Sequence, residues 1–308
     1  MIPVQQPGPT GEVLAPLAER YAHWLSLDAA QVLADREEAV ADIRAMQLVL
    51  RMERADPPSW HRAVALAAGG AAAICLDERT APGGEWHDAV ADYVRGHIRK
   101  VVRRARGAHW AAAQDLPGLT LESAGTQVRL LVPGPAAELD PRISRLQVGG
   151  TDVAPDDPLP GADPTGALHL WVPAGIPMTV GKAMAQAGHA GMICAALLGR
   201  HGADGADGAD ETDGAGWADE VHSADGADGA GGADRADWDG RQRLARWRDR
   251  GYPVAVGRLD PAAWTELRAP LAADQEAAWL DQRLLAVRDA GFTEVDPGTI
   301  TVIARAPD

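Results

Sequence analysis

A run of Ala-Asp-Gly triplets occupies residues 202–240 and limits what the rest of the chain can fold into. These residues contain ten Asp, two Glu and one Arg, so they carry a charge of 1 − 12 = −11. Because its apolar residues are mostly alanines, the run cannot bury enough surface to offset its chain entropy, and we expect disorder. A calcium-binding roll would need a nine-residue period, whereas the period here is three. The folded structure must therefore be built from the segments on either side.

The remaining composition is that of a globular, cytoplasmic protein. The net charge is −15, of which only −15 + 11 = −4 lies outside the acidic run, so a nucleic-acid partner is not excluded. Two cysteines cannot build a disulfide framework, and we expect both to be buried and reduced. The N-terminus has no signal-peptide pattern. The longest apolar run, Ala63 to Leu76, has 14 residues, which is too short to cross a membrane.

Helical periodicity dominates the first part of the chain. Apolar residues recur at helical spacing around residues 14–25 and 40–50, Ser59 suits an N-cap, and a further helix is expected from near Glu85 to about Arg106. Alternation over Thr126 to Val132 predicts a strand. We therefore expect a mainly helical N-terminal domain over residues 11–150 with a small β element.

The second part of the chain alternates strands with helices. Four prolines lie between residues 151 and 164, so residues 151–165 are expected to be a linker before a domain at residues 166–308. Strands are expected at residues 168–172, 253–257, 284–287 and 300–304, and helices at residues 178–198, 241–250, after Asp260 and at residues 275–281. This pattern predicts an α/β fold in which a mixed four-stranded sheet is flanked by helices.

The helix after the first of these strands carries the densest set of chemical groups. At about 100° per residue, Lys182, Gln186 and His189 share a wedge of about 60°. Lysine occurs only twice in the chain, so a lysine on this face favours a need for a compact charge. The plainer alternatives are a solvated Lys182 and a His189 bonded to a neighbouring carbonyl group.

A second set of polar residues follows the third of these strands. Asp289 ends that strand, where ligands gather in open α/β sheets, and Thr293 lies in the loop that follows. The alternative for Asp289 is a turn residue that binds its own backbone.

These two segments resemble the type-two peptidyl-tRNA hydrolase family. The first resembles the family's Gly-Lys helix with its later Gln and His, and the second resembles its Asp-Ala-Gly ending. The matching residues are Met178, Thr179, Gly181, Lys182, Ala185, Gln186, His189, Ala190, Asp289, Ala290, Gly291, Thr293, Pro297, Gly298, Thr299, Thr301, Val302 and Pro307.

The resemblance implies an enzyme that cleaves the ester between a peptide and the 3′-terminal ribose of tRNA, with no metal and no cofactor. It places this activity in cytoplasmic translation and ribosome rescue, with peptidyl-tRNA as the partner. It also implies a catalytic cluster of Lys182, Gln186, His189, Asp289 and Thr293. Asp289 or His189 could handle the water, while Lys182, Thr293 and Gln186 could bind phosphate or the developing oxyanion. The oligomeric state stays open, and a homodimer is one form it could take.

The sequence departs from the family in places that bear on RNA binding. Gly175 and Pro177 stand where the family carries an acidic and a basic residue, and Phe292 and Glu294 stand where it has Arg and Gln. Another part of the chain could supply the missing charge. The expected helix up to Arg106 carries six cations, which form a candidate RNA-binding face or, alternatively, a solvated helix face: Arg95, Arg99, Lys100, Arg103, Arg104 and Arg106.

Two other functions remain open at this stage. The fold could serve as a non-catalytic RNA- or protein-binding module, in which the lost basic residues reflect lost catalysis. Hydrolysis of a different ester or amide is the third hypothesis.

Overall fold

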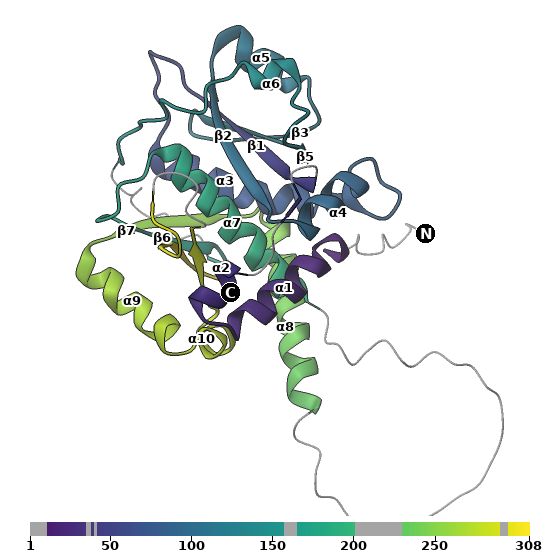
Figure 1. Cartoon of the computed structure of the whole chain (residues 1–308), viewed down its shortest axis with the longest axis vertical. Helices are drawn as coiled ribbons and strands as arrows, with labels where there is room; N and C mark the ends of the chain where they lie inside the picture. Colours follow the sequence, from purple (N-terminus) through teal and green to yellow (C-terminus); the bar gives the residue numbers. More distant parts are fainter. Residues whose placement is uncertain (1–10, 35–37, 40–41, 157–164, 201–229, 290–294) are drawn as a thin grey trace, which may run out of the picture.

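The computed structural model of the chain contains two mixed β-sheets with two long helices between them (Figure 1). It describes residues 11–34, 38–39, 42–156, 165–200, 230–289 and 295–308. Most of the acidic run and the loop that holds Phe292, Thr293 and Glu294 lie outside the described residues.

The N-terminal sheet is larger than the sequence predicts. It consists of β1 (Arg44–Arg51), β2 (Arg99–Ala105), β3 (Gly118–Ser123) and β4 (Thr126–Leu131) in the order β2-β1-β4-β3, with β5 (Gly134–Pro135) beside β1. The expected small β element is thus a five-stranded sheet, and β1 stands where a helix was expected around residues 40–50. Six of the eight residues of β1 are buried, and a strand covered on both faces shows the same continuous apolar run as a buried helix.

The basic stretch before Arg106 is also not one helix. Helix α4 (His87–Arg95) ends before Gly96, and Ile98 takes a positive φ of 43° before β2 begins at Arg99. A positive φ at a non-glycine residue cannot belong to a right-handed helix. The cations predicted to share a helix face are thus divided between a helix end and a strand.

The C-terminal sheet confirms the predicted fold. Strands β6 (Leu168–Pro173), β7 (Val254–Leu259), β8 (Leu284–Arg288) and β9 (Ile300–Arg305) pair in the order β7-β6-β9-β8. Strand β6 is parallel to β7 and antiparallel to β9, so the sheet is mixed. Helix α9 (Pro261–Ala273) begins at the predicted cap, where the Asp260 carboxylate accepts hydrogen bonds from the backbone of Ala262 and Ala263 at 2.9 and 3.0 Å. Helix α10 (Gln275–Gln282) follows.

Helix α8 (Ala230–Asp249) begins earlier than expected and includes the last part of the acidic run. Residues 230–240 were predicted to be disordered, and this was wrong. Extending a helix costs less than starting one, so the helix predicted from residue 241 can grow backward. The i,i+4 pair between Arg243 and Asp239, at 2.7 Å, supports this extension.

Helices α3 (Trp60–Cys75) and α7 (Val180–Gly199) pack against each other between the sheets (Figure 1). A single buried core includes residues of both helices and of both sheets. Cys75 and Cys194 are buried and free, as expected. The smaller elements are η1 (Glu12–Leu14), α1 (Ala15–Leu25), α2 (Ala29–Ala34), η3 (Glu78–Thr80), α5 (Gly107–Gln114) and α6 (Pro141–Ser144).

The described part of the expected linker is packed against both helices. The Thr151 carbonyl group accepts a hydrogen bond from Val180 at the start of α7 (3.2 Å), and Thr151 is buried. The Asp156 carboxylate accepts from the backbone of His61 at the start of α3 (3.0 Å). Residues 151–156 therefore join the N-terminal ends of the two helices.

Candidate active site

Helix α7 holds the first part of the candidate site at its N-terminal end. Thr179 has extended backbone angles and its hydroxyl group accepts a hydrogen bond from the backbone of Lys182 at 3.2 Å. This is an N-cap, which satisfies one of the free amide groups of the first turn. The cap places Lys182 one turn into the helix and Gln186 one turn further.

Asp289 comes to this helix from the end of β8. Its backbone amide donates to the Thr299 carbonyl group (2.9 Å), and its own carbonyl group accepts from Gly298 (2.7 Å). Gly298 has a φ of 80°, a conformation that favours glycine and that turns the chain toward β9. The carboxylate is thereby fixed inside the protein, with only 1% of the residue exposed.

Lys182, Gln186 and Asp289 form one connected cluster. Lys182 makes an ion pair with Asp289, and the Gln186 side-chain amide donates to the same carboxylate at 2.7 Å. The predicted wedge of the helix thus brings Lys182 and Gln186 to Asp289. A buried carboxylate with an ammonium and an amide donor is satisfied and held in one orientation.

The cluster contains a residue that the sequence analysis did not assign to the site. The Thr301 hydroxyl group donates to the Gln186 side-chain oxygen at 3.0 Å and also reaches the Val287 carbonyl group at 3.3 Å. Thr301 is fully buried, and it sets which side of the Gln186 amide faces Asp289. Its presence in the matched C-terminal segment was the signal that could have revealed it.

His189 lies one turn beyond Gln186 and interacts electrostatically with Lys182 of the cluster. Burial lowers its pKa well below the usual value, and the positive charges of Lys100 and Lys182 lower it further. The imidazole is therefore neutral at neutral pH and has one ring nitrogen able to accept a proton.

The predicted RNA-binding cations do not form one face. Along β2, Lys100 and Arg103 point to opposite sides of the strand. Lys100 donates to the Tyr93 hydroxyl group (3.2 Å), whereas Arg103 is buried and donates to Gln47 (2.9 Å). Arg99 is paired with Glu38, and Arg104 with Gln147. Arg95, which is paired with Asp92, and Arg106 are the two of the six that are exposed.

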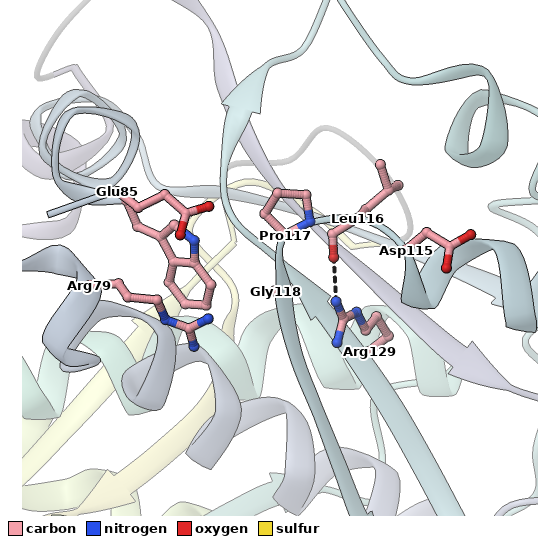
Figure 2. A pocket seen from close by; sticks show the side chains of 8 residues that line it. Arg79, Glu85, Asp115, Leu116, Pro117, Gly118 and Arg129 are labelled. Atoms are coloured by element: carbon pink, nitrogen blue, oxygen red, sulfur yellow. Dashed lines mark hydrogen bonds between the residues drawn. The ribbon is translucent and has the colours of Figure 1, made fainter.

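A cavity of about 300 Å³ lies elsewhere, on the N-terminal sheet (Figure 2). Its walls include Arg79, Glu85, Asp115 and Arg129, and Arg129 donates to the Leu116 carbonyl group. An adjoining cavity of about 290 Å³ shares Glu85 with it. Neither cavity is lined by a member of the Lys182 cluster, so the candidate chemistry does not lie in them.

Within the described ranges, the structure holds no group of three or more His, Cys, Asp or Glu side chains that could bind a metal ion. None of the helices it describes is long and apolar enough to span a bilayer.

The loop that departs from the family pattern precedes α7. Gly175 and Pro177 are exposed there, so the charged side chains expected at these positions are missing from the surface beside the cluster.

Comparison with known proteins agrees with the fold of this part. The family model described as peptidyl-tRNA hydrolase PTH2 matches residues 167–308, a little under half of the chain. No curated protein and no solved structure matched the chain. The match begins where the C-terminal sheet begins and includes every member of the Lys182 cluster. The C-terminal part of this chain, residues 167–308, is thus similar to the peptidyl-tRNA hydrolase PTH2 family.

Proposed function

We propose that this protein hydrolyses the ester bond between a peptide and the 3′-terminal ribose of tRNA, in cytoplasmic translation and the rescue of stalled ribosomes. The observation that supports the proposal best is the buried ion pair between Lys182 and Asp289, held by Gln186 and Thr301. A charged pair is costly to bury, and buried charged groups with a specific partner are common at functional sites.

The chemistry needs a positioned water molecule, a proton acceptor and a positive group for the developing oxyanion. Asp289 is fixed well enough to orient the water molecule. Lys182 supplies positive charge for the oxyanion or for a tRNA phosphate. Thr293 and Gln186 remain proposed hydrogen-bond donors, and Thr293 lies outside the described residues.

Two groups could accept the proton. The carboxylate of Asp289 is one, and the neutral imidazole of His189 is the other. The Asp289→Asn and His189→Asn variants separate them. Loss of the base flattens the acidic limb of the kcat/KM profile, whereas loss of a positioning group lowers kcat/KM at every pH.

The proposal is tested by release of N-acetyl-aminoacyl groups from tRNA by the full chain. Lys182→Met and Asp289→Asn should each lower turnover by at least about a hundredfold. Asp281→Asn, which changes an exposed carboxylate on α10, is the matched control and should keep full activity. Equal activity in the wild type, the two site variants and the control variant would refute the proposed site.

A non-catalytic RNA- or protein-binding module is the second candidate, and the exposed Gly175 and Pro177 favour it because charged residues typical of the family are absent beside the cluster, as expected if catalysis has been lost. On this alternative the protein would retain tRNA without turnover. Of the proposed RNA-binding cations, Arg95 and Arg106 are the exposed ones, and their removal should weaken binding at low salt.

A further inference from the structure

The two sheets have the same topology. In each half a strand, a long helix and a parallel strand are followed by two antiparallel strands, the second of which returns beside the first. The resulting orders are β2-β1-β4-β3 and β7-β6-β9-β8. The parallel pairs are β1 with β2 and β6 with β7, and the antiparallel pairs correspond as well.

The equivalence extends to individual residues. Leu48 pairs with Val102 in the N-terminal sheet, just as Leu170 pairs with Val256 in the C-terminal sheet. Strand register therefore aligns Leu48 with Leu170 and Val102 with Val256. The same alignment pairs Ile98 with Tyr252. Both are non-glycine residues with a positive φ, 43° and 59°, immediately before the second parallel strand.

The helix before that strand also corresponds. Five residues before Ile98 and Tyr252 lie Tyr93 and Trp247, which are both fully buried. The Tyr93 hydroxyl group donates to the Arg99 carbonyl group (3.0 Å), and the Trp247 indole donates to the carbonyl group of Pro253, the residue equivalent to Arg99 (2.8 Å). A topological coincidence would not reproduce this anchor.

The candidate active site has a counterpart in the N-terminal half. Ser59 caps α3 by accepting from Arg62 at 3.2 Å, as Thr179 caps α7 by accepting from Lys182 at 3.2 Å. Arg62 then donates to the Ser123 hydroxyl group at 3.1 Å.

Strand register places Ser123 where the C-terminal half has Asp289. Ser123 pairs with Thr126 at the hairpin, and Asp289 bonds Thr299. The contact of Arg62 with Ser123 therefore occupies the place of the Lys182–Asp289 ion pair. Leu66 takes the place of Gln186, so this copy has neither the carboxylate nor the amide.

The two halves meet through these equivalent helices. A side chain at Gly191 of α7 would collide with the Ala68 carbonyl group of α3. Each helix also touches the edge strand of the other half. A Cβ atom at Gly69 would lie 3.6 Å from Val254, and one at Gly188 would lie 2.8 Å from Lys100, the residue equivalent to Val254.

We propose that residues 44–131 are a degenerate second copy of the fold of residues 168–305, and that this silent copy occupies the place of a second subunit against α7. One chain then forms a pseudo-dimer with a single working site. The statement that the C-terminal site works rests on the proposed function, whereas the pairing of the copies does not. A fused partner packs against one face of α7, and it replaces the homodimer left open by the sequence.

The pairing is tested on the full chain by its mass and by its unfolding. Light scattering at micromolar concentration should give a single chain of 32.3 kDa. Tryptophan fluorescence and circular dichroism should report one shared unfolding transition. Gly191→Ala should lower its midpoint by on the order of 5 °C, because a methyl group meets backbone atoms there. The control Gly134→Ala, which meets nothing within 4 Å, should leave the midpoint unchanged. A stable dimer, or two transitions of which Gly191→Ala moves only one, would overturn the pairing.

Measurements of tRNA hydrolysis test whether the N-terminal copy is catalytically inactive. Turnover should persist in Ser123→Ala and disappear in Asp289→Asn, and the reverse result would overturn the assignment. If no protein turns over tRNA, the proposed function fails, but the mass and unfolding results still decide the pairing.

Discussion

At the scale of the residue, the candidate site depends on a buried ion pair. Removing the two charges from water costs free energy, and each charge needs the other to offset that cost. The side chains of Lys182 and Asp289 are only 11% and 2% exposed. Two charges removed from water stabilise each other only while both are present, and the loss of one leaves the other without compensation.

Lys182→Met should therefore destabilise the protein by about 3–5 kcal/mol, because it leaves the Asp289 carboxylate buried without its cation. Adding Asp289→Asn should restore part of this loss. Urea unfolding of the two single variants and the double variant gives the coupling energy. Additive losses would show that the pair contributes no specific interaction.

The buried side chain of Lys100 predicts how the stability of the protein depends on pH. Burial lowers its pKa to about 7, below the value of about 10.5 for an exposed lysine. The unfolded chain therefore binds more protons than the folded one between these values, so stability should rise with pH across that range and stay level below it.

Unfolding at pH 6 to 9.5 measures this slope, which should approach about 1.4 kcal/mol per pH unit in the wild type. Lys100→Met should remove it, and the exposed control Arg106→Met should retain it. Parallel curves for all three proteins would contradict the buried, neutral amine.

At the scale of the element, helix α7 followed from the sequence because its start has a local cause. The shared face of Lys182 and Gln186 was predictable from helical spacing, and the position of Asp289 from the expected end of a strand, whereas the Thr179 cap was not predicted. Thr301 matched the family pattern, but spacing alone did not place it in the site, because the register of β8 against β9 shifts between Val287 and Arg288. Strand β1 was missed because burial on both faces removes the alternation that marks a strand. Strand β2 was missed because its four cations were assigned to the expected basic helix.

The two helix caps provide a matched prediction. Ser59→Ala and Thr179→Val should each cost about 1 kcal/mol, because each removes one side-chain acceptor from a first helical turn. Thermal unfolding measures the stability, and tRNA hydrolysis measures the function. Only Thr179→Val should reduce hydrolysis, since only its helix presents Lys182 to Asp289. Equal losses of activity would contradict the assignment of the site to α7.

At the scale of the whole molecule, the two parts predicted from the sequence are joined more closely than a linker implies. Residues 151–156 bind the starts of α3 and α7, and one apolar core passes through both sheets. The division into domains at residues 11–150 and 166–308 stays a prediction. Pattern alone could not reveal the shared core, because the contacts of α3 with α7 join residues far apart in the chain.

The charge of the acidic run also acts at the scale of the whole molecule. Residues 202–229 contain seven Asp and two Glu, a charge of −9 that repels RNA at low ionic strength. Neutralising these nine residues to Asn and Gln, with the length kept, should tighten tRNA binding at low salt and have a smaller effect as salt rises. Filter binding over a salt series measures the affinity. An affinity that stays unchanged at low salt would show that the acidic run does not repel the bound RNA. The nine are Asp204, Asp207, Asp210, Glu211, Asp213, Asp219, Glu220, Asp225 and Asp228.

The packing of α3 against α7 has a consequence for how such a protein can evolve. In a symmetric dimer encoded by one gene, every substitution appears on both sides of the interface, so neither side can change alone. Here the two helices are encoded separately, and their neighbours have diverged: Lys100 lies against α7 where its equivalent, Val254, lies against α3. Selection can thus adjust the surroundings of the one helix that holds Lys182 and His189, while the other helix is free to retain only the shape that its partner needs.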